Sequence, residues 1–434
     1  MKHSGIPWIG EIPNDWITKK LKFSCKLFGR IGFRGYTADD LVSESEGAIT
    51  LSPTNMNGIK LDFTKCSYLS WDKYYESPEI MVEKGDVLLV KTASVGKCSY
   101  VDYLPKETTV NPQILVMKEH RDVLKFIAYI FQTSLGEAYI DTTKGGSTIY
   151  TISQEKIGNY EFPFPPLSEQ QKIASFLDKK CSEIDEMVVL QEKIIEELKA
   201  YKQSVITEAV TKGIRNEELG MRNYKDSGIE WIGEIPESWE VCRIKNVAKL
   251  NPSFDSQIDV DTNVSYMPME CLRNGVIQNR TALYKDVLSY TPFKDNDIVM
   301  AKVTPCFENG NIAVARNLHG GYGFGTSEIF VIRCQGDMYN QFMFYYLQSS
   351  YIKNIGVSSM TGTGGLKRVN PTTFNNAVLL HPLLSEQQEI ADYLDKKCTE
   401  IDSLISIKQS KIESLKEYKK SITYEYVTGK KEVI

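Results

Sequence analysis

The sequence lacks the residue patterns of metal-binding, disulfide-bonded and membrane proteins. Its nine cysteines are scattered over 434 residues without a C-x-x-C pair, and its four histidines, at positions 3, 120, 319 and 381, stand far apart. Zinc sites and disulfide frameworks need a regular spacing, so we expect reduced, mostly buried thiols. No run of about 18 apolar residues could span a bilayer, and the start, MKHSGIPW, lacks the apolar core of a signal peptide. These absences predict a cytoplasmic protein without a membrane partner.

Catalytic and cofactor-binding motifs are absent as well. The sequence contains no G-x-S-x-G, H-E-x-x-H or G-x-x-x-x-G-K-[ST], and no G-x-G-x-x-G after a strand. The nearest approach to an adenine-methyltransferase motif, Asn111-Pro112-Gln113-Ile114, lacks the second proline and the aromatic residue of N-P-P-[YF], and we interpret it as a turn. A net charge of −5 and a pI near 5.7 argue against a protein that coats nucleic acid without specificity. We therefore expect no enzyme that acts alone and no cofactor in this chain.

What the sequence does contain is a duplication of whole domains. The stretch SGIPWIGEIPNDW from Ser4 returns as SGIEWIGEIPESW from Ser227, with ten of thirteen positions identical. A second pair, SEQQKIASFLDKKCSEID from Ser168 and SEQQEIADYLDKKCTEID from Ser385, shares fourteen of eighteen positions. The offsets, 223 and 217 residues, exceed the roughly 20 to 50 residues of solenoid repeats. The chain therefore consists of two half-length units of the same layout.

The middles of the two halves resemble each other only in outline. Each contains a strand-like apolar run after an acidic turn, at 84–97 and 295–305, and a later helix-like run, at 126–134 and 343–350. Each then reaches a glycine turn, KGGSTIY or GTGGLKR. Short strands with few helices predict mixed α/β domains. The opening stretch, with Trp8, Ile9, Ile12 and Trp16, is interpreted as an apolar strap that packs near the helices or a docked partner.

A long helical pattern follows each middle. The first runs without Pro or Gly from a capping box, Ser168-x-x-Gln171, to Lys212, and roughly 45 residues at about 1.5 Å each would form a helix of about 67 Å. Apolar residues recur at heptad spacing in both copies, with interruptions at Gln191 and Lys408. These two seams consist of Leu177, Cys181, Ile184, Val188, Ile195, Leu198 and Val205, and of Leu394, Cys398, Ile401, Ile405, Ile412, Leu415 and Ile422. We expect the helices to pair as a coiled coil; the alternative is that each packs on its own globular domain.

Basic residues gather in stretches without acids. Residues 17–38 hold six of them, Lys19, Lys20, Lys22, Lys26, Arg30 and Arg34, and no acid. Cations without competing carboxylates suit phosphates, and glycines let a backbone approach a groove. Lys20 and Lys22 fit equally well the solvated face of a strand. Arg30 and Arg34, in a glycine-containing loop, are therefore the candidates for contact with nucleic acid.

The two glycine turns and the two strand ends add further candidates. KGGSTIY carries Lys144 and Ser147, and GTGGLKR carries Lys367 and Arg368 within an acid-free stretch. Free amides beside cations suit phosphate oxygens, although such turns are also common as plain connections. The strand ends KTASVGK and AKVTPCFENGN combine a cation with short hydrogen-bonding side chains that can reach base edges. Their candidate residues are Lys91, Thr92 and Lys97 in the first half, and Lys302, Thr304 and Asn309 in the second.

These elements together resemble the specificity (S) subunit of type I restriction-modification systems. The resemblance is carried by the repeated S-G-I-x-W-I-G-E-I-P-x-x-W, by G-D-V-L-L-V-K-T-A-S-V-G-K, and by P-P-L-S-E-Q-Q-x-I-A-x-x-L-D with its copy P-L-L-S-E-Q-Q-x-I-A-x-x-L-D. It covers essentially the whole chain in the correct order. It implies target recognition domains at 1–165 and 214–382, each reading one half of a split DNA sequence. It also implies spacer helices at 166–213 and 383–434, which form an antiparallel coiled coil that sets the gap.

The resemblance also implies partners. Two modification subunits would bind S-adenosylmethionine and methylate adenine in double-stranded DNA. Restriction subunits would use ATP and Mg²⁺ to translocate and cleave, and the S chain itself would carry no active site. Two other functions stay open: a non-catalytic coiled-coil scaffold that binds proteins, and a self-contained methyltransferase or nuclease.

Overall fold

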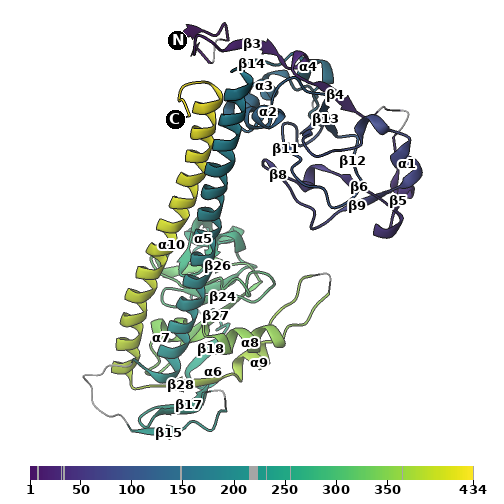
Figure 1. Cartoon of the computed structure of the whole chain (residues 1–434). Helices are drawn as coiled ribbons and strands as arrows, with labels where there is room; N and C mark the ends of the chain where they lie inside the picture. Colours follow the sequence, from purple (N-terminus) through teal and green to yellow (C-terminus); the bar gives the residue numbers. More distant parts are fainter. Residues whose placement is uncertain are drawn as a thin grey trace. The chain divides into compact units, whose positions relative to one another are not determined.

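The protein is a mixed α/β chain with two long helices, as the computed structural model shows (Figure 1). The structure describes residues 1–6, 9–30, 32, 35–146, 149–214, 223–230, 232–254, 256–363 and 365–433. The chain divides into two compact units: unit 1 is Met1–Glu192 with Gln409–Ile434, and unit 2 is Lys193–Lys408. Each long helix contributes one part to each unit. The two compact units therefore do not follow the four consecutive segments, 1–165, 166–213, 214–382 and 383–434, that the family resemblance implies.

Two four-stranded sheets form the body of unit 1. The first sheet is antiparallel throughout and has the order β11-β10-β13-β4, with β4 Lys26–Gly29, β10 Val87–Val90, β11 Cys98–Tyr100 and β13 Ile114–Lys118. The second has the order β12-β6-β9-β5, with β5 Leu41–Val42, β6 Gly47–Leu51, β9 Ser67–Ser70 and β12 Thr108–Val110, and pairs β12 with β6 in parallel. The first sheet therefore lies between two cores. In β10, Val87 and Leu89 pack with the helices, whereas Leu88 and Val90 pack with the second sheet.

Unit 2 repeats this arrangement with a different sequence. Its antiparallel sheet has the order β18-β27-β24-β25, with β18 Ala248–Leu250, β24 Ile298–Ala301, β25 Ile312–Val314 and β27 Ile329–Cys334. The second sheet has the order β22-β19-β26-β23, with β19 Asn263–Met267, β22 Arg280–Leu283, β23 Thr291–Lys294 and β26 Tyr322–Gly325, and its β19 and β26 run parallel. Side chains of β24 alternate between two cores, as those of β10 do. The strand-like runs of the sequence are thus central strands buried on both faces, which explains their unbroken apolar character.

Smaller elements complete each unit. Unit 1 has the strand pairs β1–β2 (Lys2–His3, Glu11–Ile12), β3–β14 (Ile17–Lys20, Glu161–Phe164) and β7–β8 (Met56–Asn57, Lys60–Leu61), and the helices α1 (Trp71–Tyr75), α2 (Leu124–Phe131), α3 (Ser134–Thr143) and α4 (Gln154–Gly158). Unit 2 has β15–β16 (Tyr224–Asp226, Glu234–Pro236), β17–β28 (Glu240–Arg243, Val378–His381) and β20–β21 (Leu272–Arg273, Val276–Ile277), and the helices α6 (Ile244–Val247), α7 (Asn340–Leu347), α8 (Ser350–Ser358) and α9 (Pro371–Asn375). The predicted mixed α/β class is confirmed.

The two long helices are α5, Leu167–Lys212, and α10, Leu384–Val427. In unit 1 they pair in an antiparallel sense, because Cys181 Sγ lies 3.8 Å from Thr423 Oγ1 while Asp185, one turn later in α5, binds Lys419, one turn earlier in α10. In unit 2, Lys202 Nζ of α5 donates to Asp402 of α10 at 2.7 Å. Every predicted seam residue is buried or half-buried. The predicted coiled-coil pairing of the helices is therefore confirmed. The alternative, in which each helix packs only on its own globular domain, is wrong.

The duplicated opening stretches, which end at Trp16 and Trp239, connect each body to the first turn of a long helix. Trp16 Nε1 donates to Glu169 of α5 at 3.1 Å, and Trp239 Nε1 donates to Glu386 of α10 at 2.9 Å. Both indole rings are buried, as are Ile9 and Ile12, whereas Trp8 lies outside the described residues. The opening stretch is thus the structural strap that the sequence predicted.

The glutamine of each SEQQ motif secures a second connection. Gln170 is buried, accepts a hydrogen bond from the backbone N–H of Val123 at 2.9 Å and donates to Asp122 at 2.8 Å. Gln387 likewise accepts from the N–H of Tyr339 at 2.8 Å. Since these backbone groups precede α2 and α7, each glutamine ties the start of a long helix to the helical layer of its unit. The repeated SEQQ segment therefore packs the start of each long helix against its own unit.

Candidate nucleic-acid interface

Two segments that the sequence singled out separately lie side by side in unit 1. The strand end after β10 and the glycine turn before α4 form isolated bridges at Thr92–Thr151 and Gly145–Thr151. The N–H of Ala93 donates to the carbonyl of Tyr150 at 2.9 Å, and the N–H of Ile152 donates to that of Lys91 at 2.9 Å. The described residues of 91–97 and 144–151 thus lie side by side, and we call them the loop pair of unit 1.

The glycine turn of unit 1 is a closed loop. Gly145 and Thr151 exchange two backbone hydrogen bonds, each of 2.8 Å, which close the turn at its base. Gly146 has φ +107°, and a Cβ added there would lie 2.2 Å from the carbonyl oxygen of Ile149. This position therefore requires glycine, because an L side chain rarely adopts such a φ and would also collide with the backbone.

Unit 2 builds the same loop pair from residues 302–311 and 361–368. Thr361 and Arg368 exchange backbone hydrogen bonds of 3.0 and 2.8 Å, and the N–H of Thr304 donates to the carbonyl of Lys367 at 2.9 Å. Gly362 has φ +143°, and its added Cβ would lie 2.3 Å from the carbonyl oxygen of Leu366. Figure 1 shows the segment between α8 and α9 projecting from the body of this unit. The two glycine turns thus have the same construction although their sequences differ.

The cations of the unit 1 loop pair have different surroundings. Lys91 is half-buried, and burial lowers the pKa of its ammonium group. Lys97 is exposed and donates to the carbonyl of Pro53 at 3.3 Å. Lys144 Nζ lies 2.6 Å from Asp141 Oδ1 and 4.5 Å from the centre of the Tyr150 ring. A cation over an exposed aromatic ring is suited to a phosphate with a base or sugar beside it.

In unit 2, two of the predicted DNA-contacting residues, Thr304 and Arg368, form hydrogen bonds within the protein that hold the loop pair together. The hydroxyl of Thr304 donates to the carbonyl of Gly365 at 2.8 Å and accepts from the N–H of Lys367 at 3.0 Å. Arg368 forms two hydrogen bonds of 2.8 Å to Glu328, and these bonds lower the pKa of that carboxyl group. Lys302 Nζ lies 5.7 Å from the centre of the Phe330 ring. Lys367 is exposed. Of these residues, Lys367 has the position best suited to meet a phosphate.

One predicted contact, Arg30, is buried in the structure. Arg30 is 5% exposed, its guanidinium lies over the Tyr36 ring and donates to Thr109 Oγ1 at 3.4 Å, and burial lowers its pKa. Since a phosphate cannot reach a side chain so deeply covered, the position of Arg30 argues against direct contact with nucleic acid. Arg34 and Ser147 lie outside the described residues.

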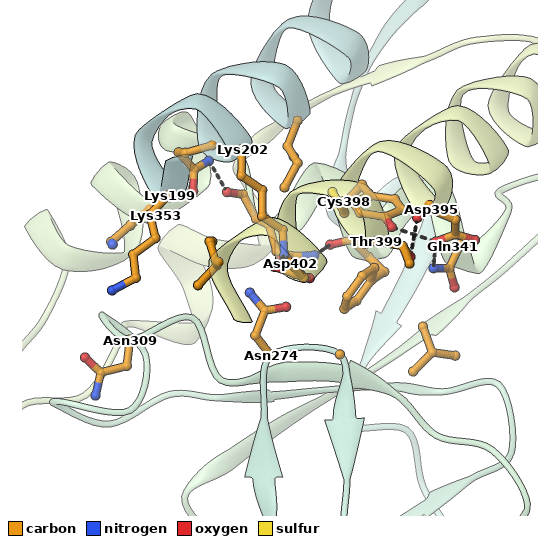
Figure 2. A pocket seen from close by; sticks show the side chains of 18 of the residues that line it. Lys199, Lys202, Asn274, Asn309, Gln341, Lys353, Asp395, Cys398, Thr399 and Asp402 are labelled. Carbon is orange, nitrogen blue, oxygen red and sulfur yellow. Dashed lines mark hydrogen bonds and ion pairs between the residues drawn. The ribbon is translucent and has the colours of Figure 1, made fainter. Parts of the chain in front are cut away.

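Asn309, the remaining predicted residue, lies at the rim of a cavity of about 1080 Å³ in unit 2 (Figure 2). Its walls are α5, α10, the β20–β21 turn and the junction of α7 with α8. The charges there largely pair within the wall: Lys202 with Asp402 at 2.7 Å, Lys199 with Glu196 at 2.8 Å, and Asp395 with the Tyr345 hydroxyl at 2.6 Å. This cavity therefore offers a polar surface without a nucleophile and base placed for catalysis among the described residues.

Comparison with known proteins decides the family. The family model described as the type I restriction modification DNA specificity domain matches residues 45–200 and 236–417, one range in each half and together more than half of the chain. The chain belongs to this family. The resemblance that the sequence motifs carry is thereby confirmed. DNA target recognition is the role of the specificity family, and its members are non-catalytic, with the catalytic activities in partner subunits.

Curated members of the specificity family match over different lengths. The type I restriction enzyme MjaVIII specificity subunit of Methanocaldococcus jannaschii is 27% identical over 371 residues, which cover 81% of this chain and 80% of that one. The EcoEI specificity subunit of Escherichia coli is 33% identical over 168 residues, 38% of this chain and 28% of that relative. The chain thus matches under a third of the length of the EcoEI subunit.

Two solved structures share the fold of this specificity-family chain. One, from work on the complex assembly and conformational transition of the type I R-M system, has a TM-score of 0.71 at 15% identity and covers 96% of this chain and 98% of its own. The other, the HsdS subunit from Thermoanaerobacter tengcongensis, has a TM-score of 0.54 at 14% identity with the same coverage. Among the described residues, no helix has the length and apolar character needed to cross a membrane, and no group of three or more His, Cys, Asp or Glu could hold a metal ion.

Replacing Gly146 with alanine is expected to distort the glycine turn of unit 1. The substitution strains a positive φ and drives a methyl group into the Ile149 carbonyl, at a cost of about 1–3 kcal/mol. Because Gly146 lies in the loop pair, we expect a lower midpoint of urea unfolding together with a loss of DNA selectivity for the half-site of unit 1. Gly145→Ala is the matched control, since its φ is not positive and its added Cβ has no atom within 4 Å. Equal effects of the two variants would contradict the role given to Gly146.

Proposed function

We propose that this chain reads a bipartite double-stranded DNA target, with one half-site read by the loop pair of each unit. The observation that carries the proposal is the recurrence of the anchored loop pair in two bodies whose intervening sequences differ. The same framework with different loop residues would give two readers with different preferences in one chain. Such a chain can read an asymmetric target, which an exact homodimer cannot easily do. The paired helices would set the gap between the half-sites.

The candidate contacts have separate roles in this proposal. Lys144 and Lys367 would meet phosphates, because each is a cation at a glycine turn of a loop pair. Lys91, Lys97, Lys302 and Thr92 lie at the strand ends that support those turns, where short and long polar side chains could reach base edges. Thr304 and the Arg368–Glu328 pair would hold the loop in shape, and Asn309 would contribute from the rim of the neighbouring turn.

The proposed partners follow from family membership and from the lack of a catalytic motif in the sequence. We propose that two modification subunits, which bind S-adenosylmethionine and methylate adenine, dock on the duplicated straps and helices, and that restriction subunits supply ATP- and Mg²⁺-dependent cleavage. The chain itself would bind none of these cofactors. Because its target is DNA, we place it in the cytoplasm.

Methylome sequencing of cells that carry or lack this chain tests the proposal. The expected result is a set of methylated adenines, present only with the chain, that defines two half-sites separated by a constant gap. A methylation pattern that does not change with the chain, together with no sequence preference when the co-purified complex is offered random duplexes, would refute it. A protein-binding scaffold predicts that second result.

Replacing Lys144 with alanine is expected to weaken DNA binding by a similar factor on all sequences. One lost phosphate contact reduces the slope of log K against log [salt] by about 1, with a weaker affinity at physiological salt. Titrations of the complex between about 50 and 200 mM salt measure that slope. Lys179→Ala, which removes an exposed cation from α5, should leave the slope unchanged. If both variants changed the slope alike, Lys144 would have no specific place at the interface.

A further inference from the structure

A large aliphatic side chain occupies the same exposed position in both glycine turns. Ile149 is 61% exposed and Leu366 is 55% exposed. In each turn the carbonyl of this residue lies over the glycine with positive φ, Gly146 or Gly362. The residue that closes the turn by backbone hydrogen bonds, Thr151 or Arg368, follows two positions later. The closed loop of unit 2 is one residue longer, since it closes between 361 and 368 rather than between 145 and 151. Ile149 and Leu366 are therefore equivalent in three-dimensional position, although an alignment of the two turn sequences does not pair them.

Single exposed apolar residues are common on protein surfaces, but this pair has a particular setting. Each side chain lies on a loop that several backbone hydrogen bonds hold to the adjacent strand end. The neighbouring residues carry cations: Lys144 lies over the ring of Tyr150, and Lys367 directly follows Leu366. Acids are absent from the sequence between Asp141 and Glu155, and between Asp337 and Glu386. The apolar group thus lies on a loop anchored at both ends, with cations beside it.

We propose that Ile149 and Leu366 are apolar wedges that enter the DNA groove and press between neighbouring bases of their half-sites. The inference rests on the proposed function and adds specificity-determining residues to it. Wedges of this kind partly unstack a base step and kink the duplex, at a cost that depends on the step. Flexible pyrimidine–purine steps are kinked most easily. Each wedge would therefore select a deformable step at one position of its half-site without a hydrogen bond to any base.

The hydrogen-bonded ends of the two turns make this mechanism physically reasonable. Backbone hydrogen bonds at both ends of each turn leave only a short segment to be ordered on DNA, which lowers the entropic cost of using the side chain as a wedge. The cations beside it would hold the phosphates that flank the opened step. Duplex DNA, with its phosphates and apolar base faces, matches both parts of this surface. An apolar docking site for a protein would match the aliphatic group alone.

The test uses the full chain co-purified with its modification subunits and duplexes that contain the half-sites found by methylome sequencing. 2-Aminopurine is placed at successive positions along each half-site, because its fluorescence rises when it is unstacked. Apart from the methylated adenine, we expect a rise at one step in each half-site. Ile149→Ala should abolish it in the half-site of unit 1 alone, and Leu366→Ala in that of unit 2 alone. The dissociation constant for the cognate duplex should rise about tenfold, with non-specific binding and the salt slope unchanged.

Matched variants make the result decisive. Leu41→Ala and Leu288→Ala remove exposed aliphatic groups, 41% and 60%, from other parts of the two bodies and should change neither signal. Ile149→Leu should keep both the fluorescence and the affinity. A fluorescence signal from the adenine that is methylated should persist in all variants, since methyltransferases extrude their target base. If the alanine variants retained wild-type selectivity and unstacking, or lost assembly with the modification subunits instead, the wedge would be overturned while sequence-specific reading by the complex would stand.

Discussion

Replacement of Trp239 by alanine is expected to lower the free energy of unfolding of unit 2 by about 3–5 kcal/mol, as removal of large buried aromatic side chains does. The ring is 0% exposed and belongs to the core that contains the end of α5 and the start of α10. Its indole N–H also loses the hydrogen bond to Glu386. We expect the urea midpoint, followed by far-UV circular dichroism, to fall accordingly, and DNA binding by the complex to fall with it.

Two further variants separate the contributions of Trp239. Trp239→Phe keeps most of the apolar volume and removes the donor, so a smaller loss of about 1–2 kcal/mol is expected. Val241→Ala changes a half-exposed side chain two residues later in β17 and should cost less than about 0.5 kcal/mol. A Trp239→Ala protein as stable as the Val241→Ala protein would show that the strap is not needed to hold the helix. Trp16→Ala and Trp16→Phe, which remove the hydrogen bond to Glu169, should give parallel losses of stability in unit 1.

Insertion of one heptad into each long helix is expected to lengthen the gap between the two methylated half-sites. Seven residues add about 10 Å to a helix, which corresponds to about three base pairs at 3.4 Å each. A whole heptad is chosen because it returns the apolar seam to the same face of the helix. The insertions belong between Glu192 and Lys193 and between Lys408 and Gln409, in the solvated stretch where the two units meet in sequence. Methylome sequencing gives the new gap directly.

The control for this experiment lengthens the apolar seam of one helix without lengthening that of the other. A heptad in α5 alone leaves α10 without residues to pair with it, so we expect loss of stability and of methylation rather than a longer gap. An insertion of three residues in each helix rotates the seam and should also fail. Paired heptads that leave the original gap unchanged would show that the helices do not set the spacing, whereas reading of each half-site by a unit would be unaffected.

The sequence by itself determined the large-scale plan of this protein. Its identical openings and SEQQ segments revealed the duplication, and the heptad spacing of residues such as Leu177 and Leu394 predicted the paired helices. These features could be predicted because they are local or periodic: a helix buries one stripe, and a repeat shows itself by identity. The motifs in order also identified the specificity family, which the family match confirmed.

The tertiary structure decided how the candidate interface is composed. It joined Thr92 to Thr151 and Val303 to Arg368, pairs separated by about sixty residues, through backbone bridges that no local pattern encodes. It buried Arg30, although the composition around it resembles that of an exposed phosphate-binding loop. It also placed Ile149 and Leu366 at one equivalent position in turns whose letters do not align. Burial and long-range contact depend on the whole core, so the same residue types can face a sheet, a partner side chain or the solvent, and the fold alone selects among these environments.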